Sequence, residues 1–177
     1  MSGNREKSIH MCHSGRKRKI FGLKQQRSKQ MNIKTKYLGE LQIEEKQIIH
    51  FPNGLLGFEN NKDFILLDVP DNEYFKFLQD INNSYICFLL VNPWDFYNDY
   101  DVELSDEELL KIEIEHDGKE QLLVLTIVTL EENFKDSTTN LLAPIVVNLL
   151  AKKGKQFVLN DSIYATKHRL FPEGIGE

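Results

Sequence analysis

The sequence predicts an all-β fold: a small antiparallel barrel-like or sandwich domain with about one short helix near residues 105–112. Three observations lead to this prediction. Short segments rich in β-branched and aromatic residues recur along the chain, clusters of glycine, proline and asparagine separate them, and one segment carries a helix start signal. With 177 residues, the chain is long enough to bury a core without a disulfide or metal staple.

The strand predictions follow the chain from residue 32 onward. Residues 74–80 alternate aromatic and polar side chains, whereas residues 85–91 are apolar on both faces until Pro93 ends the run. Each predicted strand ends near a turn signal. The predicted strands are residues 32–38, 46–51, 63–69, 74–80, 85–91, 121–130, 141–150 and 155–161.

Residues 51–59, FPNGLLGFE, combine proline, asparagine and two glycines, which is the chemistry of a turn. Glycine adopts positive φ without a steric penalty, so we expect positive φ at Gly54 and Gly57. A second turn is predicted at Asp117-Gly118, between the helix and the next strand.

The single helix is predicted from a capping box. Ser105 stands at the N-cap with Glu108 three residues later, and each side chain can bond to the backbone N–H of the other. Asp106, Glu107 and Glu108 lie in the first turn, where the helix dipole favours negative charge.

Residues 137–148, STTNLLAPIVVN, pass from small polar residues into an apolar run that contains Pro144. Proline donates no hydrogen bond to a sheet ladder, so we expect either an edge strand or a bulge here. An edge strand would offer Asn140 and Pro144 as part of a docking edge. A harmless barrel bulge is the alternative.

Charge divides the chain into unlike parts. Residues 1–30 hold nine lysines and arginines against one glutamate, whereas the other 147 residues hold 13 basic and 26 acidic side chains. We therefore expect a disordered basic extension at 1–30, a folded β domain at 31–171 and a short tail at 172–177. Folded-looking sequence begins at Met31, which supports the hypothesis that Met31 is the natural start. Residues 1–30 would then be an upstream reading or an added, non-native extension.

The extension supports two further hypotheses. Its RKRK run, residues 16–19, could contact nucleic acid electrostatically, but a solvated tail is the favoured interpretation. His10, Cys12 and His13 lack the fourth ligand and the scaffold of a metal site, and we predict no cofactor. Cys87 lies in an apolar run like a buried free thiol, which fits a reducing cytoplasm. No apolar run is long enough to span a membrane.

The common catalytic and nucleotide-binding motifs are absent from the sequence. His50, His116 and His168 remain as possible bases in the predicted domain, and no serine or cysteine stands near them in sequence. The residues therefore favour a binding protein. The alternative is a small β-barrel hydrolase or ligand-binding protein that uses His50 or His168 with a carboxylate.

The strongest chemical feature is the acidic segment, which we define as residues 95–117. It carries ten carboxylates against Lys111, interleaved with aromatic residues that begin at Trp94. The segment lacks the glycine and the final glutamate of an EF-hand. It is either a solvated surface or a docking surface for a basic protein, where carboxylates steer encounter and aromatics provide anchors.

Several segments in one order resemble the FliW family of flagellar assembly factors. They include LGELQIEEKQIIHFPNGLLGFENNKDFILL, FLLVNPWDFYNDYDVELSDEELL, VLTIVTL, TTNLLAPIVVN and GKQFVLND followed by SIYATKHRLF. The resemblance covers residues 31–171.

The resemblance implies a small cytoplasmic β protein that is not an enzyme and that binds two partners in turn. One is flagellin, held in a chaperone-like complex before export. The other is CsrA, a basic RNA-binding regulator that represses flagellin synthesis and that free FliW antagonises. We expect no direct contact of the folded domain with nucleic acid or a membrane. The candidate partner-binding residues are Trp94, Asp95, Phe96, Tyr97, Asp99, Asp101, Glu103, Asp106, Glu107, Glu108, Asn140 and Pro144.

Overall fold

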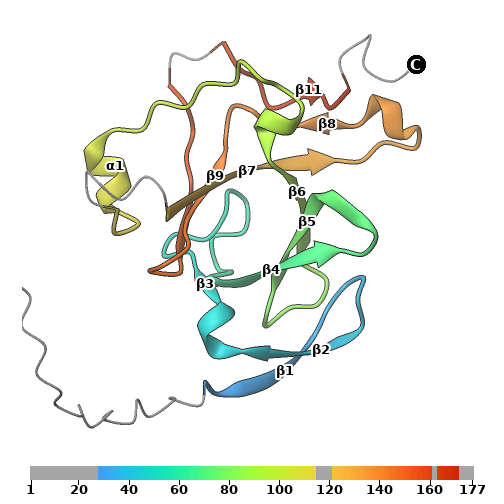
Figure 1. Ribbon diagram of the computed structural model, residues 1–177, viewed down its shortest axis with the longest axis vertical. Helices are drawn as coiled ribbons and strands as arrows, with labels where there is room; N and C mark the ends of the chain where they lie inside the picture. The colour runs from blue at the N-terminus through green and yellow to red at the C-terminus, as the bar shows by residue number, and fades with distance from the viewer. Residues whose placement is uncertain (1–27, 115–120, 161–162, 172–177) are drawn as a thin grey trace, which may run out of the picture.

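The computed structural model describes residues 28–114, 121–160 and 163–171 (Figure 1). The predictions for residues 1–27, for His116 and Asp117-Gly118, and for the tail lie outside these residues. The strands and helices of the described residues are β1 (Gln30–Lys34), β2 (Glu40–Glu44), η1 (Glu45–Gln47), β3 (Ile49–His50), β4 (Asp63–Val69), β5 (Asn72–Asp80), β6 (Cys87–Val91), η2 (Pro93–Asp95), α1 (Asp106–Leu110), β7 (Leu122–Thr129), η4 (Phe134–Asp136), β8 (Thr138–Thr139), β9 (Ile145–Asn148), β10 (Lys153–Gln156) and β11 (His168–Arg169).

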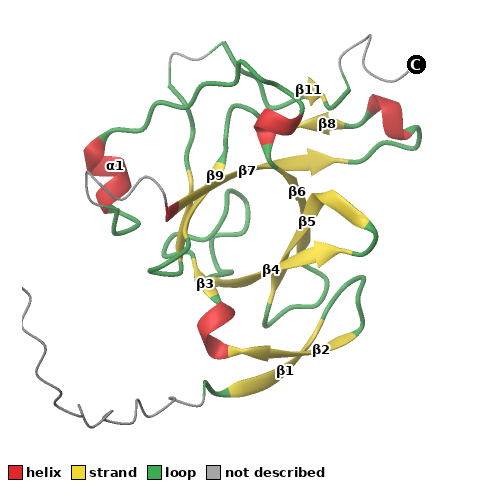
Figure 2. Ribbon diagram, viewed as in Figure 1, coloured by secondary structure: helices red, strands yellow, loops and turns green. Residues whose placement is uncertain are grey.

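The main sheet closes on itself as a barrel. Its strands follow the order β11-β8-β7-β6-β5-β4-β3-β10-β9, and β9 also pairs with β7. All of these pairings are antiparallel except the one between β10 and β3. Figure 2 shows the strands arranged around a central interior, with α1 outside the barrel. The predicted all-β, barrel-like fold with one short helix is confirmed.

The barrel interior is filled by one apolar cluster. Phe51 and Phe64 meet edge to face with 5.4 Å between ring centroids, and both are fully buried. Gly154 of β10 leaves room for this arrangement, since a Cβ there would lie 2.4 Å from Cζ of Phe51. The cluster also contains Ile49, Leu55, Leu78, Leu90, Leu125, Ile145 and Val147.

Other parts of the chain cover two regions of the barrel's outer surface. The β1–β2 hairpin packs Ile33 and Ile43 against Ile65 of β4. The region around α1 packs Leu109 and neighbouring apolar residues against Val146 of β9. A third region, on β5, β6 and β7, is covered only in part, by the cluster that includes residues 96, 170 and 171.

The turn prediction for residues 51–59 is confirmed. Gly54 has φ of +70° and Gly57 has φ of +81°. A Cβ at Gly54 would also lie 2.5 Å from the Phe58 carbonyl oxygen, so glycine is required there for space as well as for backbone conformation.

The prediction that residues 141–150 form an edge strand is wrong. The strand β9 begins only at Ile145, is fully buried, and pairs with β7 on one side and β10 on the other. Pro144 lies just before the strand, where its missing N–H interrupts no ladder, and its carbonyl accepts a bond from Phe157 N–H at 2.9 Å. Asn148 ends the strand by donating to the Ile112 carbonyl at 3.0 Å.

Candidate protein-interaction site

The acidic segment leaves β6 through η2 and crosses to α1 over one end of the barrel (Figure 1). Its middle part, residues 101–105, belongs to no helix or strand. The described carboxylates at Asp95, Asp99, Asp101, Glu103, Asp106, Glu107 and Glu113 are all exposed. Such a surface attracts basic partners over distances comparable to the Debye length, roughly 8–10 Å in physiological salt.

Glu108 differs from the other carboxylates because it caps the helix. Its Oε2 accepts bonds from the Ser105 N–H at 3.1 Å and the Ser105 hydroxyl at 3.2 Å, while the Glu108 N–H donates to Ser105 Oγ at 3.3 Å. The predicted capping box is therefore present, and Glu108 is half-buried. Its role within the segment is first of all structural.

Trp94 is the one candidate anchor that stands out from the surface, with 39% of its area exposed. Its Nε1–H donates to the Tyr100 carbonyl at 2.8 Å, and the two rings lie 5.8 Å apart. The indole is therefore held in a fixed orientation. A preorganised aromatic side chain loses little conformational entropy when a partner covers it.

Phe96 and Tyr97 are half-buried and belong to the support of the segment. Phe96 contacts the ring of Phe171 at 5.7 Å between centroids. The Tyr97 hydroxyl donates to the Arg169 carbonyl. Burial raises the pKa of the Tyr97 phenol, so it stays a neutral donor at physiological pH.

Tyr100 fixes the middle of the acidic segment to the barrel. It is 4% exposed, and its hydroxyl donates to the Leu141 carbonyl at 2.7 Å. Its ring lies 4.7 Å from that of Tyr164, whose hydroxyl accepts a bond from the Asp101 N–H at 2.8 Å. Burial, together with the neighbouring Tyr164, raises the pKa of Tyr100 strongly. These contacts hold the exposed carboxylates on a rigid base.

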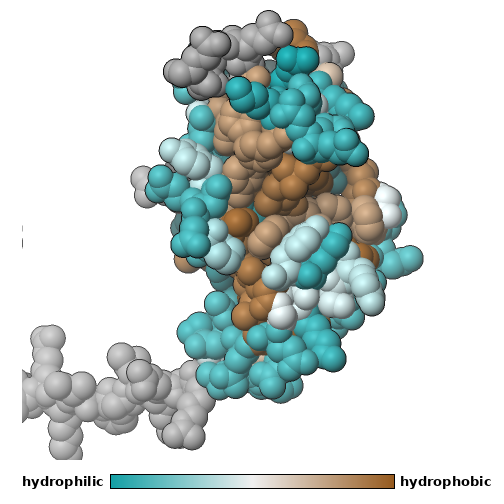
Figure 3. All heavy atoms as spheres, turned by 90° about the vertical axis from the view of Figure 1, so that its right-hand side faces the viewer, coloured by the Kyte–Doolittle hydropathy of each residue, from teal (hydrophilic) through white to brown (hydrophobic). Residues whose placement is uncertain are grey.

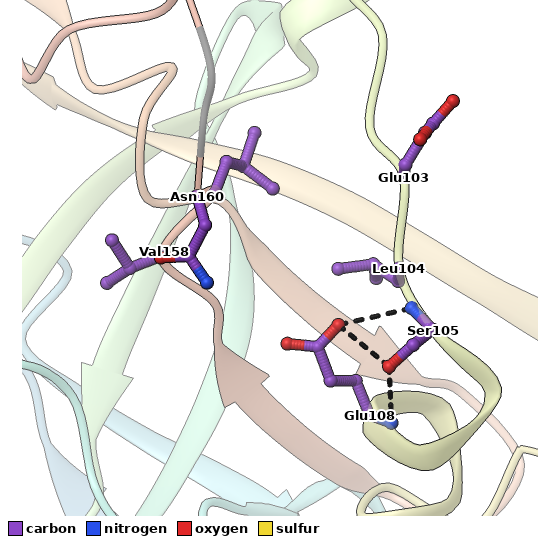
Figure 4. A pocket seen from close by; sticks show the side chains of 7 residues that line it. Glu103, Leu104, Ser105, Glu108, Val158 and Asn160 are labelled. Carbon is purple, nitrogen blue, oxygen red and sulfur yellow. Dashed lines mark hydrogen bonds between the residues drawn. The ribbon is translucent and has the colours of Figure 1, made fainter.

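A hollow of about 400 Å³ separates the acidic segment from the chain that follows β10 (Figure 4). Glu103, Leu104 and Glu108 line one side of the hollow, and Val158 and Asn160 line the other. In Figure 4 the Glu108 carboxylate is turned to Ser105 and the Glu103 side chain points away from the opposite wall.

Asn140 and Pro144 both have structural roles in the turn before β9. The Asn140 side-chain oxygen accepts a bond from the Ala143 N–H at 3.0 Å, which stabilises the turn before β9. Pro144 is buried and offers no surface to a partner. The segment STTNLLAPIVVN therefore lies beneath the acidic segment, which it supports through the Leu141 carbonyl.

Of the two described histidines, His50 has the carboxylate neighbour that the enzyme alternative calls for. Its Nδ1 lies 2.7 Å from Asp63 Oδ1 where β3 pairs with β4, and both side chains are partly exposed. His168 Nε2 accepts a bond from the Ala165 N–H at 2.8 Å, and its ring packs against those of Tyr97 and Tyr164. Within the described residues, no group of three or more histidine, cysteine or acidic side chains could hold a metal ion. Nor does any described helix have the length and apolar content of a membrane span.

Sequence reasoning missed a second surface, on the outside of β5, β6 and β7. Tyr37, Tyr74, Leu130 and Phe134 are between 47% and 61% exposed and line two neighbouring hollows there. A signal for this surface was present in residues 85–91, which are apolar on both faces although a barrel wall needs only one apolar face.

Cys87 faces this surface and provides a chemical test of it. Burial raises the pKa of Cys87 to about 11, which Lys36 opposes only weakly. Because the thiolate is the reactive form, we expect Cys87 in a Cys12→Ser protein to react with iodoacetamide at pH 8 about 100-fold more slowly than a peptide thiol of pKa near 9. The rate should rise about tenfold per pH unit up to pH 10. A rate equal to that of the peptide would contradict the burial of the thiol.

The barrel, the acidic segment held against it and the exposed apolar surface together define a small closed β-barrel protein with two candidate interaction surfaces. The FliW protein family model matches residues 32–170, so the chain belongs to the FliW family. One relative, called flagellar assembly factor FliW, comes from Geobacillus sp. (strain WCH70). It is 40% identical over 147 residues, which cover 83% of this chain and 100% of the relative. Another, in Clostridium botulinum, is 39% identical over 143 residues, 81% of this chain and 99% of the relative. A crystal structure of the flagellar assembly factor FliW superposes with a TM-score of 0.75 at 38% identity and covers 82% of this chain and 100% of that chain.

Proposed function

We propose that the chain is a non-enzymatic partner switch in flagellar assembly. It binds flagellin in a chaperone-like complex in the cytoplasm. When flagellin leaves for export, the free protein binds the basic regulator CsrA and antagonises it, which relieves the repression of flagellin synthesis. Family membership supports the role in flagellar assembly, and the exposed acidic segment is the observation that supports a basic protein as partner.

The charge of the acidic segment indicates whether it acts on an RNA or on a protein that binds RNA. A row of exposed carboxylates repels the phosphates of RNA, so the protein does not compete for an RNA by binding it. The same carboxylates attract the lysines and arginines of an RNA-binding protein and speed encounter with it. The acidic segment therefore acts on the regulator protein itself. Trp94, held by its bond to Tyr100, offers a desolvated anchor at the start of the same segment.

Reversal of two carboxylates tests this proposal. We expect Asp101→Lys/Glu103→Lys to weaken binding of CsrA by at least about tenfold at 0.1 M salt, mostly through slower association. Both side chains are exposed and neither caps α1, so the fold should persist. Surface plasmon resonance at several salt concentrations gives both rate constants and the salt dependence of the affinity.

The matched control is Glu40→Lys/Glu45→Lys, which makes the same change in net charge on the exposed side of β2 and η1. We expect this variant to keep most of its affinity for CsrA. If the two variants lose affinity equally, net charge alone explains the effect and the acidic segment is not the binding site. Flagellin capture by both variants shows whether the second partner uses the same surface.

A further inference from the structure

The apolar surface on β5, β6 and β7 forms a groove, which Figure 3 shows as a continuous apolar area between hydrophilic regions. Two hollows make up the groove, one of about 470 Å³ and one of about 350 Å³. Asn72, Phe75 and Phe134 line both hollows, so the two are adjacent. The first also contacts Tyr37, Phe77 and Leu130, and the second contacts Tyr74, Phe96 and Phe171.

The other apolar regions of the barrel's outer surface are covered by the chain itself, one by the β1–β2 hairpin and one by the residues around α1. On β5, β6 and β7 the cover is incomplete, and large apolar side chains face solvent. Leu130 is 55% exposed and Tyr74 is 51% exposed. Exposed apolar area gathered in one groove is typical of an interaction site.

The backbone pairing of these strands limits the kind of segment that can bind. The groove lies on the face of the sheet, where β5 pairs with β4 and β6, and β6 pairs with β5 and β7. No strand edge is therefore available for an added strand along β5 or β6. A segment bound here contacts the sheet through side chains only, which suits an α-helix because it satisfies its own backbone hydrogen bonds.

The length and the charge of the groove define the helix further. Two adjacent hollows match apolar side chains one or two turns apart, about 5–11 Å along a helix. Asp95 lines the second hollow. Asp71 in the β4–β5 turn and Glu73 in β5 lie beside it, next to Asn72 and Tyr74. These carboxylates complement lysine or arginine on the flank of the helix.

We propose that the groove docks an amphipathic α-helix of a protein partner, with lysine or arginine beside its apolar face. The identity of the partner rests on the proposed function. If the acidic segment binds CsrA, flagellin is the partner that the groove binds. The two surfaces adjoin at Asp95 and Phe96, which begin the acidic segment and line the second hollow.

The first experiment uses a synthetic probe and does not depend on the proposed function. The probe is an 18-residue peptide with leucines at helical i, i+3, i+4, i+7 spacing and lysines elsewhere. We expect the full-length chain to bind it, and Leu130→Asp and Tyr74→Asp each to weaken binding at least tenfold by fluorescence anisotropy. An added aspartate cannot weaken a purely electrostatic contact with lysine, so this loss isolates the apolar contact.

Leu150→Asp is the matched control, because Leu150 is 71% exposed and lies after β9, outside the groove. It should bind the peptide as the parent does. A peptide with glutamate in place of lysine should bind at least tenfold more weakly. Bound peptide should also slow alkylation of Cys87, which lines the first hollow. Equal binding by the groove variants and the control overturns the proposal, as does unchanged alkylation.

The second experiment measures flagellin and CsrA with the same variants. We expect the affinity of the groove variants for flagellin to fall at least tenfold and their affinity for CsrA to stay unchanged. Flagellin that binds all variants equally overturns the groove as its site but leaves the proposed function intact. If flagellin binds neither the parent chain nor any variant, the proposed function is contradicted. In that case the peptide experiment alone tests whether the groove binds an amphipathic helix.

The same variants also test two other possible occupants of the groove, a second copy of the chain and its own basic segment. A parent chain that sediments as a dimer, and as a monomer after Leu130→Asp, would assign the groove to a second copy and overturn the proposal. Residues 16–24 of the chain also combine basic residues with Ile20, Phe21 and Leu23. A tenfold gain in peptide affinity on deletion of residues 1–27 would assign the groove to that segment instead.

Discussion

Replacement of Phe51 by alanine is expected to lower the free energy of unfolding by about 3–5 kcal/mol, the range for large-to-small changes at buried aromatic residues. Phe51 is fully buried where the barrel closes, against Phe64 and the Cα of Gly154. The closely paired strands around it cannot collapse into the space, so the cavity term adds to the lost transfer free energy. Urea unfolding followed by circular dichroism measures the change.

Phe134→Ala is the control for this prediction, since it removes the same side chain from a position that is 47% exposed. We expect it to cost less than about 1.5 kcal/mol, because nearly half of the side chain already faces water. Equal costs at both positions would mean that the barrel interior is not the main source of stability.

The local pattern of the sequence predicts some strands closely, others only in part, and closure of the sheet poorly. Of the predicted strand at residues 155–161, for example, only residues 155 and 156 belong to a strand. Residues 63–69 were predicted as a strand and form β4 with the same bounds. Residues 141–150 were predicted as one long edge strand, whereas β9 spans only Ile145–Asn148 and lies inside the sheet. Closure depends on the pairing of β9 with β7 and of β10 with β3, and these contacts are too distant in sequence for a local pattern to show them.

For the candidate site too, local features could be predicted from the sequence and long-range contacts could not. Exposed charge could be predicted, because isolated acidic side chains are almost never buried. The roles of the aromatic residues could not be predicted. Trp94, Phe96 and Tyr100 have similar sequence surroundings, and their burial differs because of contacts with distant parts of the chain. Phe96 packs against the chain near its C-terminal end, and Tyr100 bonds to Leu141. The groove was missed because its residues come from separate parts of the chain.

Tyr100→Ala is the second change with a large expected effect, and it joins stability to function. Loss of the buried ring should lower the free energy of unfolding by about 3–5 kcal/mol. Loss of the hydroxyl leaves the Leu141 carbonyl without its 2.7 Å partner. Tyr100→Phe removes only the hydroxyl, so we expect it to cost about 1 kcal/mol. The difference between the two variants separates ring packing from the hydrogen bond.

The functional consequence follows from the position of Tyr100 between the barrel and the acidic segment. Without the ring, Trp94 loses its ring contact with Tyr100, and Tyr164 loses the ring that positions its bond to the Asp101 N–H. The carboxylates keep their charge but lose their common base. We therefore expect Tyr100→Ala, at a temperature where it is folded, to bind CsrA with faster dissociation and nearly unchanged association. Charge reversal at Asp101 and Glu103 should instead slow association. If Tyr100→Ala slows association and leaves dissociation unchanged, the support under the acidic segment has no part in holding the partner.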